Sequence, residues 1–169
     1  MDSSQNPATC SPQLKRDPLG GAINPANRSR FVYVTYIRTT SAELWKALTD
    51  PQLIRQYRFD TSVECGWNKG STWKMTHPDR GLLDTGEILE IDPPRRIVIR
   101  WQNEWEPEFK AEGPSRCTIE LEPGDNSVKL TITHEIDRPE SPFITAVSDG
   151  WPRILSNLKS LLETGQVVL

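Results

Sequence analysis

The first clear hydrophobic pattern lies at Phe31–Arg38, where apolar and aromatic residues fall on both faces of an extended segment. This pattern predicts a β-strand that is covered on both faces. The next four residues, Thr40-Ser41-Ala42-Glu43, have the form of a capping box. In this motif the Thr40 side chain accepts a hydrogen bond from the Glu43 amide, and the Glu43 side chain accepts one from the Thr40 amide. We therefore expect a helix that buries three apolar side chains: Leu44, Trp45 and Leu48.

A second short helix and a series of strands are expected next. Asp50 suits the N-cap and Pro51 the first helical position, so this helix should run to about Tyr57. Short alternating segments follow, separated by turns rich in Gly, Pro, Asn and Asp, as in an antiparallel meander. The six predicted strands lie near Ser62–Gly66, Ser71–His77, Gly81–Ile91, Arg95–Asn103, Arg116–Glu122 and Ser127–Glu135.

The last two of these strands alternate between apolar and polar positions. The residues that share their apolar face are Cys117, Ile119, Leu121, Val128, Leu130, Ile132 and His134. The residues between them are polar, which predicts a sheet with one buried face and one solvent-exposed face. Another element must cover the apolar face of the sheet.

The C-terminal segment supplies the long apolar stripe for that purpose. Its helical positions are Trp151, Ile154, Leu155, Leu158, Leu161 and Leu162. Pro152 should interrupt the helix, so the residues before Gly150 are expected to form a separate or kinked turn, with Asp149 as a candidate cap. A single sheet gripped by one helix is an architecture that can form a pocket.

Residues 1–29 differ in composition from the rest of the chain. They hold four prolines, a Gly-Gly pair and many Ser and Asn residues. Such a segment cannot bury enough apolar surface to offset the entropy of ordering, so we predict a disordered tail before one domain at residues 30–165.

Charge and hydropathy exclude several classes of function. The net charge is −3 over 169 residues, which argues against a nucleic-acid partner. No apolar run approaches the roughly 20 residues of a membrane span, and the first thirty residues lack the apolar stretch of a signal peptide. We therefore expect a cytoplasmic protein without a membrane partner. The three cysteines are widely spaced, which favours reduced thiols over disulfides.

Three segments of the chain together resemble a known family. They are Thr40–Pro51, Gly86–Arg96, and Thr133–Glu135 taken with Gly150–Leu155. In these segments the chain resembles the activator-of-Hsp90-ATPase-like family of the START-like, helix-grip (SRPBCC) superfamily. The resemblance covers roughly residues 30–164. The resemblance implies an α+β helix-grip fold, in which a curved seven-stranded antiparallel sheet surrounds a long C-terminal helix and two short helices follow the first strand. It also implies a cavity between that helix and the sheet.

The residues for catalysis and metal binding are few. His77 and His134 are the two histidines, and His134 continues an apolar strand face, where it is either a hydrogen-bonded core residue or a base in the cavity. The His and Cys residues lack metal-ligand spacing, so we predict no metal and no cofactor. An acidic stretch at 104–112, with glutamates at 104, 106, 108 and 112, is either a solvated hairpin loop or an oxygen-ligand cation site.

Six tryptophans exceed what a core of this size needs, and aromatic walls suit an apolar pocket. The helix-grip geometry implied by the family places the start of the last helix against the cavity. The predicted ligand-binding residues are Trp151, Leu155, Leu158, Leu162, Trp73, Met75, Trp101, His134 and Tyr33. Tyr36 is an alternative to Tyr33 as the polar group for a ligand.

These observations leave three hypotheses about function. The first is non-enzymatic binding or sequestration of a small hydrophobic molecule, as in relatives associated with stress response or resistance. The second is a protein–protein module, either a chaperone cofactor of the Hsp90 type or a partner of a regulator, which would use the acidic stretch. The third and weakest is a cyclase or hydrolase with His134 as its base.

Overall fold

The computed structural model describes residues 27–169. The predicted disordered tail therefore lies almost entirely outside the described residues. The first described strand begins at Ser29.

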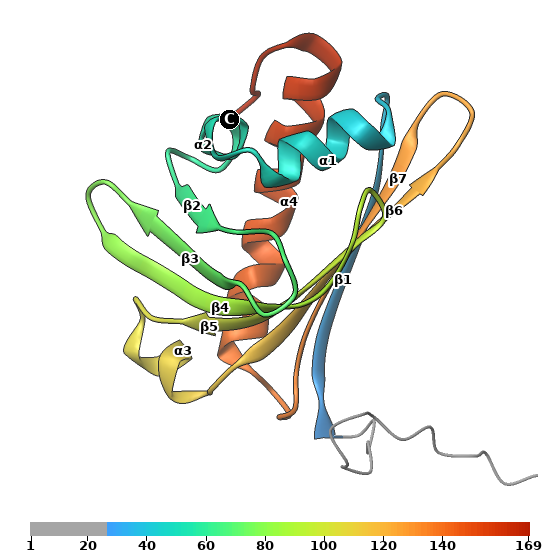
Figure 1. Cartoon of the computed structure of the whole chain (residues 1–169). Helices are drawn as coiled ribbons and strands as arrows, with labels where there is room; N and C mark the ends of the chain where they lie inside the picture. Colours follow the sequence, from blue (N-terminus) through green and yellow to red (C-terminus); the bar gives the residue numbers. More distant parts are fainter. Residues whose placement is uncertain (1–26) are drawn as a thin grey trace, which may run out of the picture.

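Seven strands form one curved antiparallel sheet in the order β1-β7-β6-β5-β4-β3-β2 (Figure 1). The strands are β1 (Ser29–Ile37), β2 (Ser62–Cys65), β3 (Thr72–His77), β4 (Gly81–Asp92), β5 (Arg96–Asn103), β6 (Ser115–Pro123) and β7 (Val128–Ile136). The sheet and its order confirm the predicted fold class. The ends of the six strands after the first lie within one residue of the predicted ones.

The helices of the described chain are α1 (Ser41–Thr49), α2 (Pro51–Tyr57), α3 (Pro107–Ala111) and α4 (Pro142–Thr164). The capping box before α1 is present, since Thr40 Oγ1 accepts from the Glu43 amide at 3.2 Å and Glu43 Oε2 accepts from the Thr40 amide at 3.3 Å. Asp50 caps α2 as predicted, accepting from the amide of Gln52 at 2.8 Å. Trp45, predicted to be buried, is only partly buried.

The C-terminal helix α4 is continuous over 23 residues, so the predicted interruption at Pro152 is wrong. Ser141 caps the helix, its hydroxyl accepting from the Ile144 amide at 3.1 Å. Phe143 and Ile144 are buried in the core, and this packing holds the first turns helical although Pro152 cannot donate to the preceding turn. Asp149, the predicted cap, is therefore an exposed residue inside the helix.

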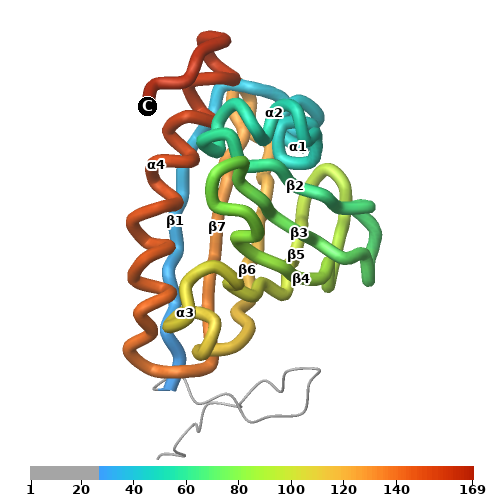
Figure 2. The backbone as a smooth tube through the Cα atoms, turned by 90° about the vertical axis from the view of Figure 1, so that its left-hand side faces the viewer, coloured from blue at the N-terminus to red at the C-terminus, as the bar shows by residue number. Residues whose placement is uncertain are grey.

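One face of β1 is more exposed than predicted. Val32, Val34 and Tyr36 are 46%, 45% and 59% exposed. β1 is an edge strand, and α4 runs alongside it (Figure 2). Phe31 and Tyr33 pack against the core, while no described element covers the outer face. The prediction that both faces of this strand are covered is therefore wrong.

The alternation of β6 and β7 is confirmed. Cys117, Leu130, Ile132 and His134 are fully buried on the inner face. This inner face, α1, α2 and α4 enclose one core. No helix in residues 27–169 is long and apolar enough to cross a membrane.

Candidate functional site

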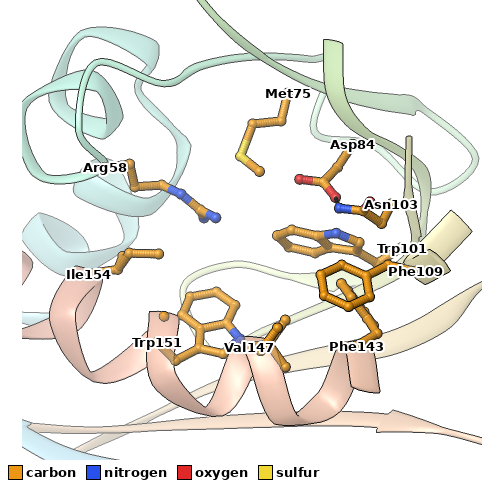
Figure 3. Close-up of a pocket in the computed structure, with 12 residues that line it drawn as sticks. Arg58, Met75, Asp84, Trp101, Asn103, Phe109, Phe143, Val147, Trp151 and Ile154 are labelled. Carbon is orange, nitrogen blue, oxygen red and sulfur yellow. Dashed lines mark hydrogen bonds between the residues drawn. The ribbon is translucent and has the colours of Figure 1, made fainter. Parts of the chain in front are cut away.

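A cavity of about 220 Å³ lies between α4 and strands β3, β4 and β5 (Figure 3). Its apolar walls are formed by Met75, Trp101, Phe109, Phe143, Val147, Trp151 and Ile154. Its polar groups are Arg58, Asp84 and Asn103. A mainly apolar hollow with a few convergent polar groups has the general composition of a small-molecule site.

Two tryptophans, Trp101 and Trp151, line this cavity, and Trp73 packs behind Trp101. The rings of Trp73 and Trp101 lie 4.3 Å apart, and the ring of Trp101 lies 6.2 Å from that of Trp151 in an edge-on arrangement. Trp151 belongs to α4 and the other two to the sheet, so the aromatic contacts join the helix to the sheet. Such pairs stabilise packing beyond the area that they bury.

Gly86 of β4 allows the sheet tryptophans to meet. It is the register partner of Trp73 on one side and of Trp101 on the other. A Cβ at this position would lie 2.1 Å from the carbonyl oxygen of Arg100. The lack of a side chain at Gly86 therefore permits both the strand spacing and the contact between the two indoles across β4.

Arg58 provides a positive charge at the cavity. It follows α2, and its guanidinium carbon lies 5.3 Å from the ring centre of Trp151 and 5.7 Å from that of Trp101. No carboxylate in residues 27–169 forms an ion pair with it. The indole faces stabilise this cation through their quadrupoles, and its N–H groups stay available to a ligand.

Asp84 is a buried carboxyl group on the opposite side of the cavity. Asn103 Nδ2 donates to its Oδ1 at 2.9 Å. Burial raises the pKa of Asp84 above its ordinary value, although the neighbouring side chains of Trp101 and Asn103 act in the opposite direction. The Trp101 indole N–H points toward this carboxyl group (Figure 3) yet forms no hydrogen bond in the described part of the chain.

His134 lies behind the tryptophans. Trp151 Nε1 donates to His134 Nδ1 at 3.3 Å, so the ring proton resides on Nε2, which contacts Ser115 Oγ at 2.8 Å. The Ser115 hydroxyl donates to the Trp101 carbonyl at 3.2 Å. Burial, and secondly the charge of Arg58, lower the pKa of His134 to about 3. His134 is therefore a neutral core residue that connects two walls of the cavity.

The predicted site residues occupy different places around this cavity. Met75, Trp101 and Trp151 line it, whereas Trp73 and Leu155 line an adjoining gap of about 20 Å³. His134 and Leu158 are fully buried in the core, while Leu162 and Tyr33 are partly buried against it. A role of these nine residues in ligand binding stays a prediction.

Sequence reasoning missed the charged residues Arg58 and Asp84, and Phe143 and Val147 of α4. A signal for Asp84 was present, since it occupies an inward position of β4, in register with Asn103 of β5. Phe143 and Val147 were missed because the helix was expected to begin later. Nothing in the pattern around Arg58 distinguishes it from a surface arginine.

The acidic stretch connects β5 to β6 and has several exposed residues, as predicted, but it is not an irregular loop throughout. It contains α3, and Glu104 pairs with Lys110 at 2.7 Å. The Glu112 side chain is only 3% exposed and accepts from the Phe143 amide at 2.8 Å. No cluster of three or more metal-ligating side chains occurs in residues 27–169.

Comparison with protein families gives a match over most of the chain. The model of the family described as activator of Hsp90 ATPase homolog 1-like protein matches residues 38–163. No curated protein is significantly similar to the chain in sequence.

Many solved structures share the fold. A Mesorhizobium loti protein is 23% identical, with a TM-score of 0.70 over 82% of this chain and 100% of the other. An HSP90 activator from Plasmodium falciparum is 22% identical, with a TM-score of 0.65 over 79% of this chain and 95% of the other. The Aha1 dimer from Colwellia psychrerythraea is 17% identical, with a TM-score of 0.66 over 81% and 98%. At these identities the similarity demonstrates the fold alone.

Proposed function

The chain belongs to the family of activator of Hsp90 ATPase homolog 1-like proteins, and from this premise we propose that it binds a small, largely apolar molecule in the cavity between α4 and the sheet. The family and its helix-grip fold indicate a ligand-binding domain. The observation that carries the finer proposal is the cavity itself, which has tryptophan and phenylalanine walls.

The volume of the cavity accommodates one or two rings, and the rest of a larger aromatic molecule can extend through its open side. Its volume is about 220 Å³, and an apolar cavity of about 150 Å³ is sufficient for benzene. The cavity is not sealed by the core, since Val147 and Ile154 on its α4 side are only partly buried. A flat molecule can therefore pack against Trp101 and Trp151 and displace water from apolar surface.

Binding without catalysis is favoured by the state of the histidine. His134 is neutral, and both of its ring nitrogens are hydrogen-bonded within the core. A general base must have a nitrogen free to reach a substrate. The wider prediction, that binding serves stress response or resistance, rests on the family alone.

Titration with the fluorescent probe N-phenyl-1-naphthylamine tests the proposal. Wild-type protein should bind the probe with increased fluorescence, and Val147→Trp should weaken binding at least about tenfold because the larger side chain occupies the cavity. Thr145→Trp, an exposed position on the same helix, is the matched control and should bind as wild type. Absence of probe binding, or equal binding by both variants, would contradict the proposal.

A second candidate function, contact with a protein partner, is favoured by the exposed apolar face of β1. Val32, Val34 and Tyr36 form this face on an edge strand. An Hsp90-type chaperone is the partner that the family suggests. If the chain stimulates the ATPase rate of purified Hsp90, Val34→Glu should abolish the stimulation, whereas unchanged stimulation would exclude this face.

A further inference from the structure

A second hollow of about 390 Å³ adjoins the cavity and shares Arg58, Met75 and Ile154 with it. We call this hollow the vestibule. It is also lined by Phe59, His77, Arg80 and Arg153. A molecule that fills the cavity can therefore extend past Arg58 into the vestibule.

The vestibule concentrates positive charge that no carboxylate of the described residues pairs with. Arg58, Arg80 and Arg153 line it, and no carboxylate of residues 27–169 does. None of these three forms an ion pair with a carboxylate of the described chain, whereas seven other arginines do so. The whole chain carries a net charge of −3, so the patch does not follow from overall composition.

Each of the three guanidinium groups lies over an aromatic ring instead. Arg58 lies 5.3 Å from the ring of Trp151, Arg80 lies 5.3 Å from that of Trp105, and Arg153 lies 5.5 Å from that of Phe59. Stacking on a ring holds a guanidinium in place without using its N–H donors.

The backbone at the rim supports a functional origin for this arrangement. Phe59 has a φ of 51°, which is uncommon for a residue with a large side chain. This conformation places an apolar ring, 41% exposed, under Arg153. Strained residues of this kind persist where surrounding structure maintains them, often at binding sites.

We propose that the vestibule binds the anionic group, a carboxylate or sulfonate, of an aromatic acid whose ring system occupies the cavity. The inference deepens the proposed function and rests on it. Planar anionic groups match the donor geometry of arginine, and flat rings match the tryptophan walls.

Two probes that differ in one group test this inference. 8-Anilinonaphthalene-1-sulfonate has the same ring system as N-phenyl-1-naphthylamine and carries an additional sulfonate. Each exposed charge contact should contribute up to about fivefold in affinity, so the double variant Arg80→Gln/Arg153→Gln should bind the sulfonate about tenfold more weakly. Its affinity for the neutral probe should change less than about twofold.

Arg100→Gln is the matched control, because Arg100 is an exposed arginine of β5 that forms no ion pair within residues 27–169 and lines neither hollow. It should leave the affinities for both probes unchanged. Higher ionic strength should weaken binding of the sulfonate probe to the wild-type protein and should leave the affinity for the neutral probe unchanged. Arg58 is kept in both variants because it also packs against the cavity walls.

The outcomes separate the two proposals. If neither probe binds, the cavity proposal itself fails. If both probes bind and the double variant weakens them equally, or weakens neither, the cavity is a binding site but the inference about the vestibule is overturned. Equal loss of sulfonate binding in Arg100→Gln also overturns it, because it would indicate general attraction to surface charge.

Discussion

His134 is the residue on which the geometry of the cavity walls depends most directly. It accepts from the indole N–H of Trp151 and contacts the hydroxyl of Ser115, which in turn bonds to the backbone of Trp101. One imidazole thereby connects α4 to β5 through β7 and β6. Since a buried donor without a partner costs free energy, the neutral imidazole is required for the folded state.

The burial of His134 predicts a pH dependence of stability. Its pKa is lowered to about 3 in the folded protein and stays near about 6.5 in the unfolded chain. Between these values the unfolded chain binds more protons, so stability is lost as the pH falls below about 6.5. This residue alone should lower the free energy of unfolding by about 2 kcal/mol between pH 6.5 and roughly pH 4.5.

Urea unfolding of wild type and His134→Gln at both pH values measures this contribution. Glutamine keeps a polar partner for Trp151 and does not titrate, so the variant should lose about 2 kcal/mol less than wild type over the same interval. Burial raises the pKa of Asp84, so its contribution to the pH dependence of stability has the opposite sign. That contribution is the same in both proteins and cancels in the comparison. Equal losses in the two proteins would contradict the assignment.

At the scale of elements, β4 depends on Gly86. Adding a Cβ there would bring it 2.1 Å from the Arg100 carbonyl of β5, so the strands would have to separate. Gly86→Ala should lower the free energy of unfolding by about 1–3 kcal/mol in denaturant titration. Gly150→Ala in α4 is the control, because its Cβ would have no neighbour within 4 Å and should stabilise the helix by up to about 1 kcal/mol. Similar effects of both changes would refute the packing argument.

The start of α4 depends on Glu112, which lies after α3 and accepts hydrogen bonds from Ser141 Oγ and the Phe143 amide. A carboxylate at this end of a helix satisfies free amides and interacts favourably with the helix dipole. Glu112→Gln should therefore lower the free energy of unfolding by about 1–3 kcal/mol.

Glu108 provides the matched control for that prediction. It belongs to the same acidic stretch, is exposed, and forms no side-chain bond within residues 27–169. Glu108→Gln should change stability by less than about 0.5 kcal/mol. Thermal unfolding of both variants would measure the difference, and equal Tm values would show that Glu112 does not anchor α4.

Elements with a strong local pattern were predictable from sequence, and those fixed by distant contacts were not. The alternation of β6 and β7 and the caps of α1 and α2 are local, and each was found. The start of α4 has a local signal, the Ser141 cap before Pro142, but its first turns also depend on Glu112 and on burial of Phe143, which lie outside the local pattern. The local effect of Pro152 therefore led to a wrong helix start.

At the scale of the whole molecule, the cavity combines segments that are far apart in the chain. Arg58 follows α2, Asp84 lies in β4 and Val147 lies in α4. The family resemblance predicted a cavity with Trp151 against it, and aromatic content added Trp101 as a predicted wall residue. Asp84 carried a signal in its inward position on β4, but Arg58 could not be predicted, because the side of the cavity that it faces is decided by the curvature of the sheet and the path of α4.

Occupation of the cavity should stabilise the whole fold, because the cavity exists only while α4 lies against the sheet. At about ten times its Kd, N-phenyl-1-naphthylamine should add about 1.4 kcal/mol to the free energy of unfolding. For a chain of this size that corresponds to a rise in Tm of roughly 3–6 °C. Differential scanning calorimetry should show this rise in wild type and Thr145→Trp, and a rise of no more than roughly 1–2 °C in Val147→Trp. A rise in Val147→Trp as large as that in wild type would place the probe elsewhere, for instance on the exposed face of β1.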